Sequence, residues 1–173
     1  MPAAGLNCHC LARACRRFRD ATGDWPPGYG PARNIGAYNH GPYPREAARL
    51  YRIAAEAGNP VAKNNLGAMF EAGEGASPRN PREAARLYRL AADQEYPAAQ
   101  ANLAALYDFG RSGLARDDRE AVRLWQRAAE REESGAQTNL GTMYATGRGG
   151  LPRDDRKSAR MWRLAAEQGS TEA

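Results

Sequence analysis

One stretch of sequence, REAARLYRIAAEAG at residues 45–58, recurs three times and decides the fold. The later copies are REAARLYRLAADQE (82–95), REAVRLWQRAAERE (119–132) and RKSARMWRLAAEQG (156–169), and each begins 37 residues after the last. Self-similarity at a fixed period of this length is typical of proteins built from stacked supersecondary units. The chain is therefore expected to be a repeat array.

A second segment recurs between these copies, and the two together define the units. It reads AKNNLGAMFEAG (62–73), AQANLAALYDFG (99–110) and AQTNLGTMYATG (136–147), with a degenerate earlier copy, ARNIGAYNHG, at 32–41. We expect an irregular basic leader with a Pro/Gly linker, followed by a repeat domain. The predicted segments are 1–31 for the leader and 32–173 for the domain, with a degenerate unit 32–60 and full units 61–97, 98–134 and 135–171.

Each unit is expected to form two helices. The second helix carries apolar residues at i, i+3, i+4, i+7 and i+8, the stripe of an amphipathic helix; in one copy these are Ala84, Leu87, Tyr88, Ala91 and Ala92. Capping residues mark its start, and glycine ends the first helix. The predicted N-caps are Asn80, Asp117 and Asp154, the capping-box partners are Glu83 and Glu120, and the terminal glycines are Gly73, Gly110 and Gly147.

Composition agrees with an all-α fold. Alanine supplies 35 of 173 residues, whereas valine, isoleucine and threonine together supply only nine, which nearly excludes a sheet protein. The net charge is +5, and no apolar run approaches the length needed to span a bilayer. Residues 1–20 also lack the apolar core of a signal peptide. The compartment stays open, with the cytoplasm favoured.

A single helix pair cannot bury its own apolar face, so neighbouring pairs must stack. The expected architecture is a right-handed α-α superhelix, a solenoid of helix-turn-helix repeats. Large side chains fill the space between pairs. The last pair leaves its far face open, and we favour a fragment or a frayed end over a face that meets a partner or a second copy. The predicted space-filling residues are Tyr51, Tyr88, Trp125 and Trp162.

The last unit resembles the Sel-1-like repeat family, a relative of tetratricopeptide repeats. It carries A-x-x-x-L-G-x-x-Y-x-x-G and then D-x-x-x-A-x-x-W-x-x-A-A-E-x-G, over residues 136–147 and 155–169. The resemblance covers about residues 32–173 and implies a non-enzymatic adaptor or scaffold that binds a protein or peptide. Members are reported in bacterial signalling and envelope assembly and in eukaryotic membrane-protein degradation.

Three residues depart from the family pattern and put the loop geometry in question. Ala104 replaces a glycine of the first helix, and Glu95 and Glu132 replace the glycine that usually ends the second helix. A cysteine-rich branch of the family is reported to bind or hydrolyse β-lactams. No cysteine lies in any unit here, so β-lactam hydrolysis is kept only as an alternative function.

By analogy with tetratricopeptide arrays, the exposed side of the first helices is expected to line a concave, slightly acidic groove for the partner. Phe109 is the candidate anchor of this groove. Asn65, Asn102 and Asn139 recur beside it and are expected to hydrogen-bond between helices. The predicted partner-binding residues are Asn64, Ala68, Glu71, Ala101, Asp108, Phe109, Thr138 and Thr142.

Arginines recur at i, i+4 and i+7 on the second helices. A basic stripe of this kind could bind an acidic partner or nucleic-acid phosphates. We favour a solvated outer face, because acids four residues on (Arg52 with Glu56, Arg89 with Asp93, Arg163 with Glu167) can pair with them and no stacking aromatics interleave. The residues of the stripe are Arg82, Arg86, Arg89, Arg119, Arg123, Arg156, Arg160 and Arg163.

No catalytic, metal or cofactor site is predicted. Cys8, His9, Cys10 and Cys15 are zinc-ligand types, but their spacing is crowded and matches no common finger. His40 has no nucleophile beside it in sequence. The expected partner is therefore a protein or peptide, nucleic acid is disfavoured, and no small-molecule substrate is expected.

Overall fold

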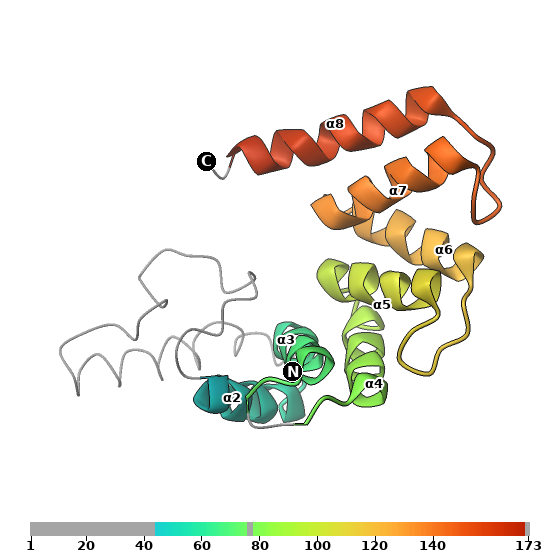
Figure 1. Ribbon diagram of the computed structural model, residues 1–173. Helices are drawn as coiled ribbons and strands as arrows, with labels where there is room; N and C mark the ends of the chain where they lie inside the picture. The colour runs from blue at the N-terminus through green and yellow to red at the C-terminus, as the bar shows by residue number, and fades with distance from the viewer. Residues whose placement is uncertain (1–43, 76–77, 172–173) are drawn as a thin grey trace, which may run out of the picture. The chain divides into compact units, whose positions relative to one another are not determined.

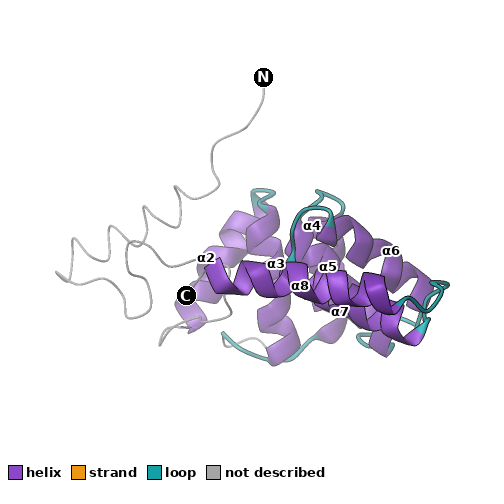
Figure 2. Ribbon diagram, turned by 90° about the horizontal axis from the view of Figure 1, so that it is seen from above, coloured by secondary structure: helices purple, strands orange, loops and turns teal. Residues whose placement is uncertain are grey.

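The computed structural model describes residues 44–75 and 78–171, which form helices joined by loops and contain no strand within these ranges (Figures 1 and 2). The all-α prediction is confirmed for this part of the chain. The helices are α2 (Pro44–Glu56), α3 (Pro60–Ala72), α4 (Pro81–Ala92), α5 (Pro97–Phe109), α6 (Asp118–Ala129), α7 (Ser134–Thr146) and α8 (Asp155–Thr171).

Two compact units divide the chain, Met1–Asn80 and Pro81–Ala173. In the described part of the first unit, α2 packs against α3. In the second unit each helix packs against the next, from α4 to α8, and α5 also contacts α7. This sequential packing of α4–α8 is the arrangement of a helical solenoid.

The predicted N-caps of the second helices are confirmed at Asp117 and Asp154. The Asp117 carboxylate accepts from the main-chain N–H groups of Arg119 and Glu120, both at 3.0 Å, and Asp154 accepts from that of Lys157 at 2.9 Å. The second hydrogen bond of the predicted capping box, from the main-chain N–H of Asp117 to the Glu120 carboxylate, does not form, so this prediction is wrong. The Glu120 carboxylate binds Arg123 instead, and the main-chain N–H of Asp117 donates to a carbonyl of the preceding helix.

Each first helix ends as predicted, at a glycine with left-handed backbone angles. The φ values of Gly73, Gly110 and Gly147 are 80°, 60° and 67°, a region that glycine enters without steric strain. One main-chain bond then spans each of the loops that follow. It runs from Asn80 N to Phe70 O at 2.8 Å, from Asp117 N to Tyr107 O at 3.0 Å and from Asp154 N to Tyr144 O at 2.9 Å.

In the family pattern a glycine ends the second helix. The turn keeps its left-handed conformation where glutamate replaces that glycine. Glu95 and Glu132 have φ values of 59° and 62°, in the same left-handed region as Gly58, whose φ is 94°. Glu95 also forms ion pairs with Arg131 and, at 3.6 Å, with Arg127. The two glutamates therefore keep the turn while adopting a conformation that side chains rarely take.

The core consists of small residues with a few large ones. Tyr51, Tyr88 and Trp125 are buried, with exposed fractions of 6%, 1% and 1%, as predicted. Trp162 is 45% exposed, so the prediction that it is enclosed is wrong. Within the described residues α8 has a packed neighbour, α7, on one side only; its open far face was expected.

Candidate interaction surface

The residues predicted to line a groove do not form one exposed surface. Phe109 is 60% exposed, Thr138 and Thr142 are exposed, and Glu71 and Asp108 are half-buried. The expected exposure is wrong for three residues, because the packing of the helices encloses them. These are Asn64, Ala68 and Ala101, with exposed fractions of 5%, 6% and 9%.

The exposed threonines of α7 use their hydroxyl groups within the helix. Thr138 donates to the carbonyl of Ser134 at 3.0 Å, Thr142 to that of Thr138 at 3.3 Å, and Thr146 to that of Thr142 at 2.8 Å. Each hydroxyl hydrogen is thus already bonded. These hydroxyl groups therefore offer no free hydrogen on this face of α7.

Phe109, at the end of α5, is the exposed aromatic residue of the predicted groove. The guanidinium carbon of Arg111 lies 4.6 Å from the centre of its ring, a cation–π contact. An exposed ring held by a neighbouring cation is a typical anchor for a partner side chain. The prediction of Phe109 as an anchor stays a prediction.

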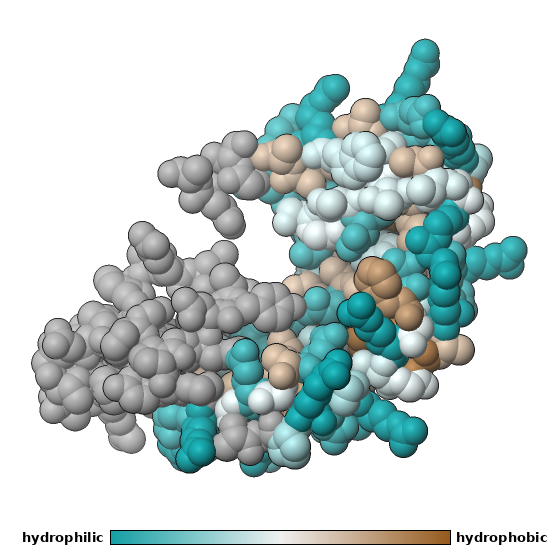
Figure 3. Space-filling view, viewed as in Figure 1, coloured by the Kyte–Doolittle hydropathy of each residue, from teal (hydrophilic) through white to brown (hydrophobic). Residues whose placement is uncertain are grey.

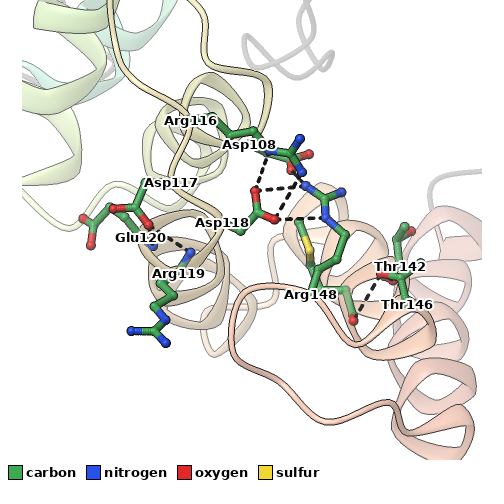
Figure 4. Close-up of polar contacts among 10 residues, drawn as sticks. Asp108, Arg116, Asp117, Asp118, Arg119, Glu120, Thr142, Thr146 and Arg148 are labelled. Carbon is green, nitrogen blue, oxygen red and sulfur yellow. Dashed lines mark hydrogen bonds and ion pairs between the residues drawn. The ribbon is translucent and has the colours of Figure 1, made fainter.

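Asp108 belongs to an ion cluster that ties three segments of the second unit together (Figure 4). Arg148, in the loop after α7, donates to Asp108 at 2.5 Å and to both oxygens of Asp118 at 3.0 and 3.1 Å. Arg116 also binds Asp118, at 2.8 Å. Hydrogen bonds from Arg116 and Arg148 lower the pKa of Asp118 to about 2. Asp108 is therefore a structural group.

Sequence analysis did not find this cluster, although it joins the end of α5, the start of α6 and the loop after α7. Arg148 lies 40 residues from Asp108 and 30 from Asp118. No local pattern links positions so far apart. Only the stacking of the hairpins brings the three side chains together.

Two of the eight arginines in the stripe pair with a glutamate three residues earlier. Arg86 binds Glu83 and Arg123 binds Glu120, both at 2.6 Å, and in the first unit Arg49 binds Glu46 at 2.7 Å. The expected pairs of Arg52, Arg89 and Arg163 with acids four residues on do not form; Arg89 instead donates to the Tyr107 hydroxyl at 3.0 Å.

On α8 the stripe has no such counter-ions. Arg156, Arg160 and Arg163 are exposed, and none has an ion pair within the described residues. The position held by Glu46, Glu83 and Glu120 in the earlier copies is Lys157 here. This reversal is visible in the aligned repeats and could have been recognised from sequence.

The cysteines and histidines considered as metal ligands or catalytic groups lie outside the described residues. Cys8, His9, Cys10, Cys15 and His40 fall in the first 43 residues, which the structure does not describe. Across the described ranges no three histidine, cysteine or acidic residues gather as metal ligands. None of the helices in those ranges has the length and apolar character of a membrane span.

Comparison with known proteins gives a consistent family. The model of the Sel1 repeat matches residues 34–59, 60–96, 97–132 and 134–170. No curated protein matches the sequence. Among solved structures, a Sel1 repeat protein from Oxalobacter formigenes is 31% identical with a TM-score of 0.66, and the alignment covers 72% of this chain and 48% of that protein.

A second solved structure is c5321, described as a protective antigen present in uropathogenic Escherichia coli strains that displays an SLR fold. It is 27% identical with a TM-score of 0.67, over 95% of this chain and 34% of that protein. The chain thus spans about half the length of the first structure and a third of the second.

Proposed function

Because the chain belongs to the Sel1 repeat family, whose members are generally protein–protein interaction modules, we propose that it is a non-enzymatic adaptor that binds a protein or peptide. Sel1 repeat proteins are typically non-catalytic scaffolds. The proposed binding surface is the exposed face of α7 together with Phe109 at the end of α5, which is its anchor.

The exposure of Phe109 is the observation that carries this proposal. Phe109 is 60% exposed, so a partner that covered its ring would gain free energy from burying apolar surface. The end of α5 is also a fixed platform, because Asp108 beside Phe109 is bound to Arg148 after α7. A rigid aromatic group loses little entropy on binding and is a common energetic centre of interfaces.

Site-specific photo-crosslinking tests the proposal. A photoreactive phenylalanine analogue replaces Phe109 or Thr142, and exposed Glu130 serves as the matched control outside the surface. We expect the first two positions to form one discrete adduct with a protein in the source cells and the control to form none. Phe109→Ala should abolish the adduct from position 142.

Three outcomes would contradict the proposal. They are equal crosslinking from all three positions, turnover of a chromogenic β-lactam by the purified chain, and tight, steeply salt-dependent binding of nucleic acid.

A further inference from the structure

Within the described residues, α8 has a side that no other helix covers, where small apolar residues and the exposed part of Trp162 lie beside arginines without ion pairs; the indole nitrogen of Trp162 itself bonds to α7. We propose that this side of α8 docks an amphipathic helix of a protein partner, one that carries small apolar residues beside carboxylates. The inference rests on the proposed adaptor function and assigns it a second surface. The apolar strip on this side is Ala159, Trp162 and Ala166, and its basic border is Arg156, Arg160 and Arg163.

The preceding repeat shows what this face accommodates. One repeat earlier the strip is Val122, Trp125 and Ala129 on α6, and there α7 packs on α6. Val122 and Trp125 are only 4% and 1% exposed. Their counterparts on α8, Ala159 and Trp162, are exposed. The positions that the fold encloses on α6 are therefore exposed on α8 within the described residues.

A polar contact of the kind expected at the edge of this interface already occurs within the chain. On α4, Arg89 donates to the hydroxyl of Tyr107 on the next helix at 3.0 Å. Arg163 stands two repeats after Arg89, at the same position of its helix. A helix seated on α8 as α5 is seated on α4 would therefore bring the counterpart of Tyr107 within reach of Arg163.

The charges on α8 indicate which residue the partner helix should carry at the position equivalent to Tyr107. Lys157 occupies the glutamate position of the earlier repeats, so Arg160 lacks the carboxylate that Arg86 and Arg123 have. Lys157 instead faces Asp154 at 3.8 Å and the ring of Tyr144 at 5.4 Å. Carboxylates on the incoming helix would supply the missing counter-ions, and charge-assisted bonds are stronger than neutral ones.

The same charges disfavour a second copy of this chain as the occupant. Two α8 faces would bring the arginine borders together, and like charges at an interface oppose association. A lipid surface fits poorly as well, because the strip has only one large apolar side chain, Trp162, and little area to insert. The acidic amphipathic helix is the occupant that satisfies both the strip and its border.

A peptide copied from α7, the helix that covers α6, tests this idea on the full chain. The probe has the sequence of residues 134–148 with Tyr144→Glu, placing a carboxylate opposite Arg163; its matched control carries Tyr144→Lys. A hydrocarbon link between the Thr138 and Thr142 positions, exposed in α7, holds each peptide helical. NMR signals of the indole N–H groups report where they bind.

The acidic peptide should shift the Trp162 indole signal, leave that of buried Trp125 in place, and bind about tenfold more tightly than the lysine peptide, because it gains a charge-assisted hydrogen bond. Lys157→Glu restores the intrahelical partner of Arg160 and should weaken binding several-fold while leaving the thermal midpoint unchanged or higher. Arg119→Ala, on α6, should leave binding unchanged.

Equal affinity for the two peptides, or no shift at Trp162, overturns the inference. Self-association of the free chain that Trp162→Ala abolishes would assign the face to a second copy. A larger Trp162 shift with a single-stranded oligonucleotide or with anionic vesicles would assign it to those ligands. Crosslinking from Phe109 and Thr142 does not involve α8, so failure here is distinguishable from failure of the proposed function.

Discussion

The indole nitrogen of Trp162 lies 3.1 Å from the main-chain carbonyl oxygen of Thr138 and donates a hydrogen bond to it. Gly141, one turn further along α7, permits this approach because it has no side chain. One repeat earlier Ala104 takes the place of the glycine, and the buried indole N–H of Trp125 finds no acceptor in the described part of the chain. The two repeats thus differ by the methyl group of Ala104 and by whether the tryptophan indole has an acceptor.

Gly141→Ala should therefore destabilise the chain by about 1–3 kcal/mol, the range typical of overpacking. The new Cβ would lie 2.4 Å from Nε1 and 2.5 Å from Cδ1 of Trp162, so the ring must move and lose its bond to Thr138. Urea denaturation measures the loss. If the indole is its cause, the same substitution made in a Trp162→Ala background should have a much smaller effect.

Trp125→Ala should lower the free energy of unfolding by about 3–5 kcal/mol, because it leaves a large cavity in a packed core. Trp162→Ala should cost clearly less, since that ring is 45% exposed whereas Trp125 is 1% exposed. Thermal denaturation of the two variants side by side checks the difference. Equal losses would mean that α8 is covered in solution.

Glu132→Gly should stabilise the chain by about 0.5–1 kcal/mol, because glycine removes about 1–2 kcal/mol of left-handed strain while adding unfolded-state entropy. Glu95→Gly removes the same strain but also the ion pairs with Arg127 and Arg131. Its gain should be smaller by the few tenths of a kcal/mol that exposed pairs contribute. A rise for Glu95→Gly that equals or exceeds the other would show that these pairs contribute nothing.

Asp118 makes stability depend on acid pH. Its folded pKa of about 2 lies below its ordinary value of 3.8, so its contribution is present above about pH 4 and is lost as the pH falls toward 2. Asp118→Asn should be less stable than the parent at pH 5, and the gap should close by pH 2. A gap that persists unchanged at pH 2 would place the effect in the shape of the side chain rather than its charge.

Sequence reasoning succeeded where the determinants are local. The caps at Asp117 and Asp154 and the glycine ends of α5 and α7 follow from residues within one turn, and repetition made them easy to recognise. It failed where the outcome depends on a neighbouring helix. Burial of Ala101 is a property of stacked hairpins, which no single-repeat pattern contains.

The surface prediction failed for a related reason. Sequence analysis assigned Glu83 and Glu120 to capping boxes, although Arg86 and Arg123 follow them by three residues on one helix face. In the structure these two arginines bind the glutamates. The difference on α8 depends on one residue, Lys157, which becomes meaningful only when the repeats are compared column by column.

The bond that spans each loop uses only main-chain atoms at both ends, from Asn80, Asp117 or Asp154 to the aromatic residue ten positions earlier. No particular side chain is needed to make it. The glycine that opens each loop is still required for the left-handed turn, and Arg148 in the last loop is required for the ion cluster. Variation at other loop positions is accordingly a route by which successive units can acquire different binding chemistry on a constant frame.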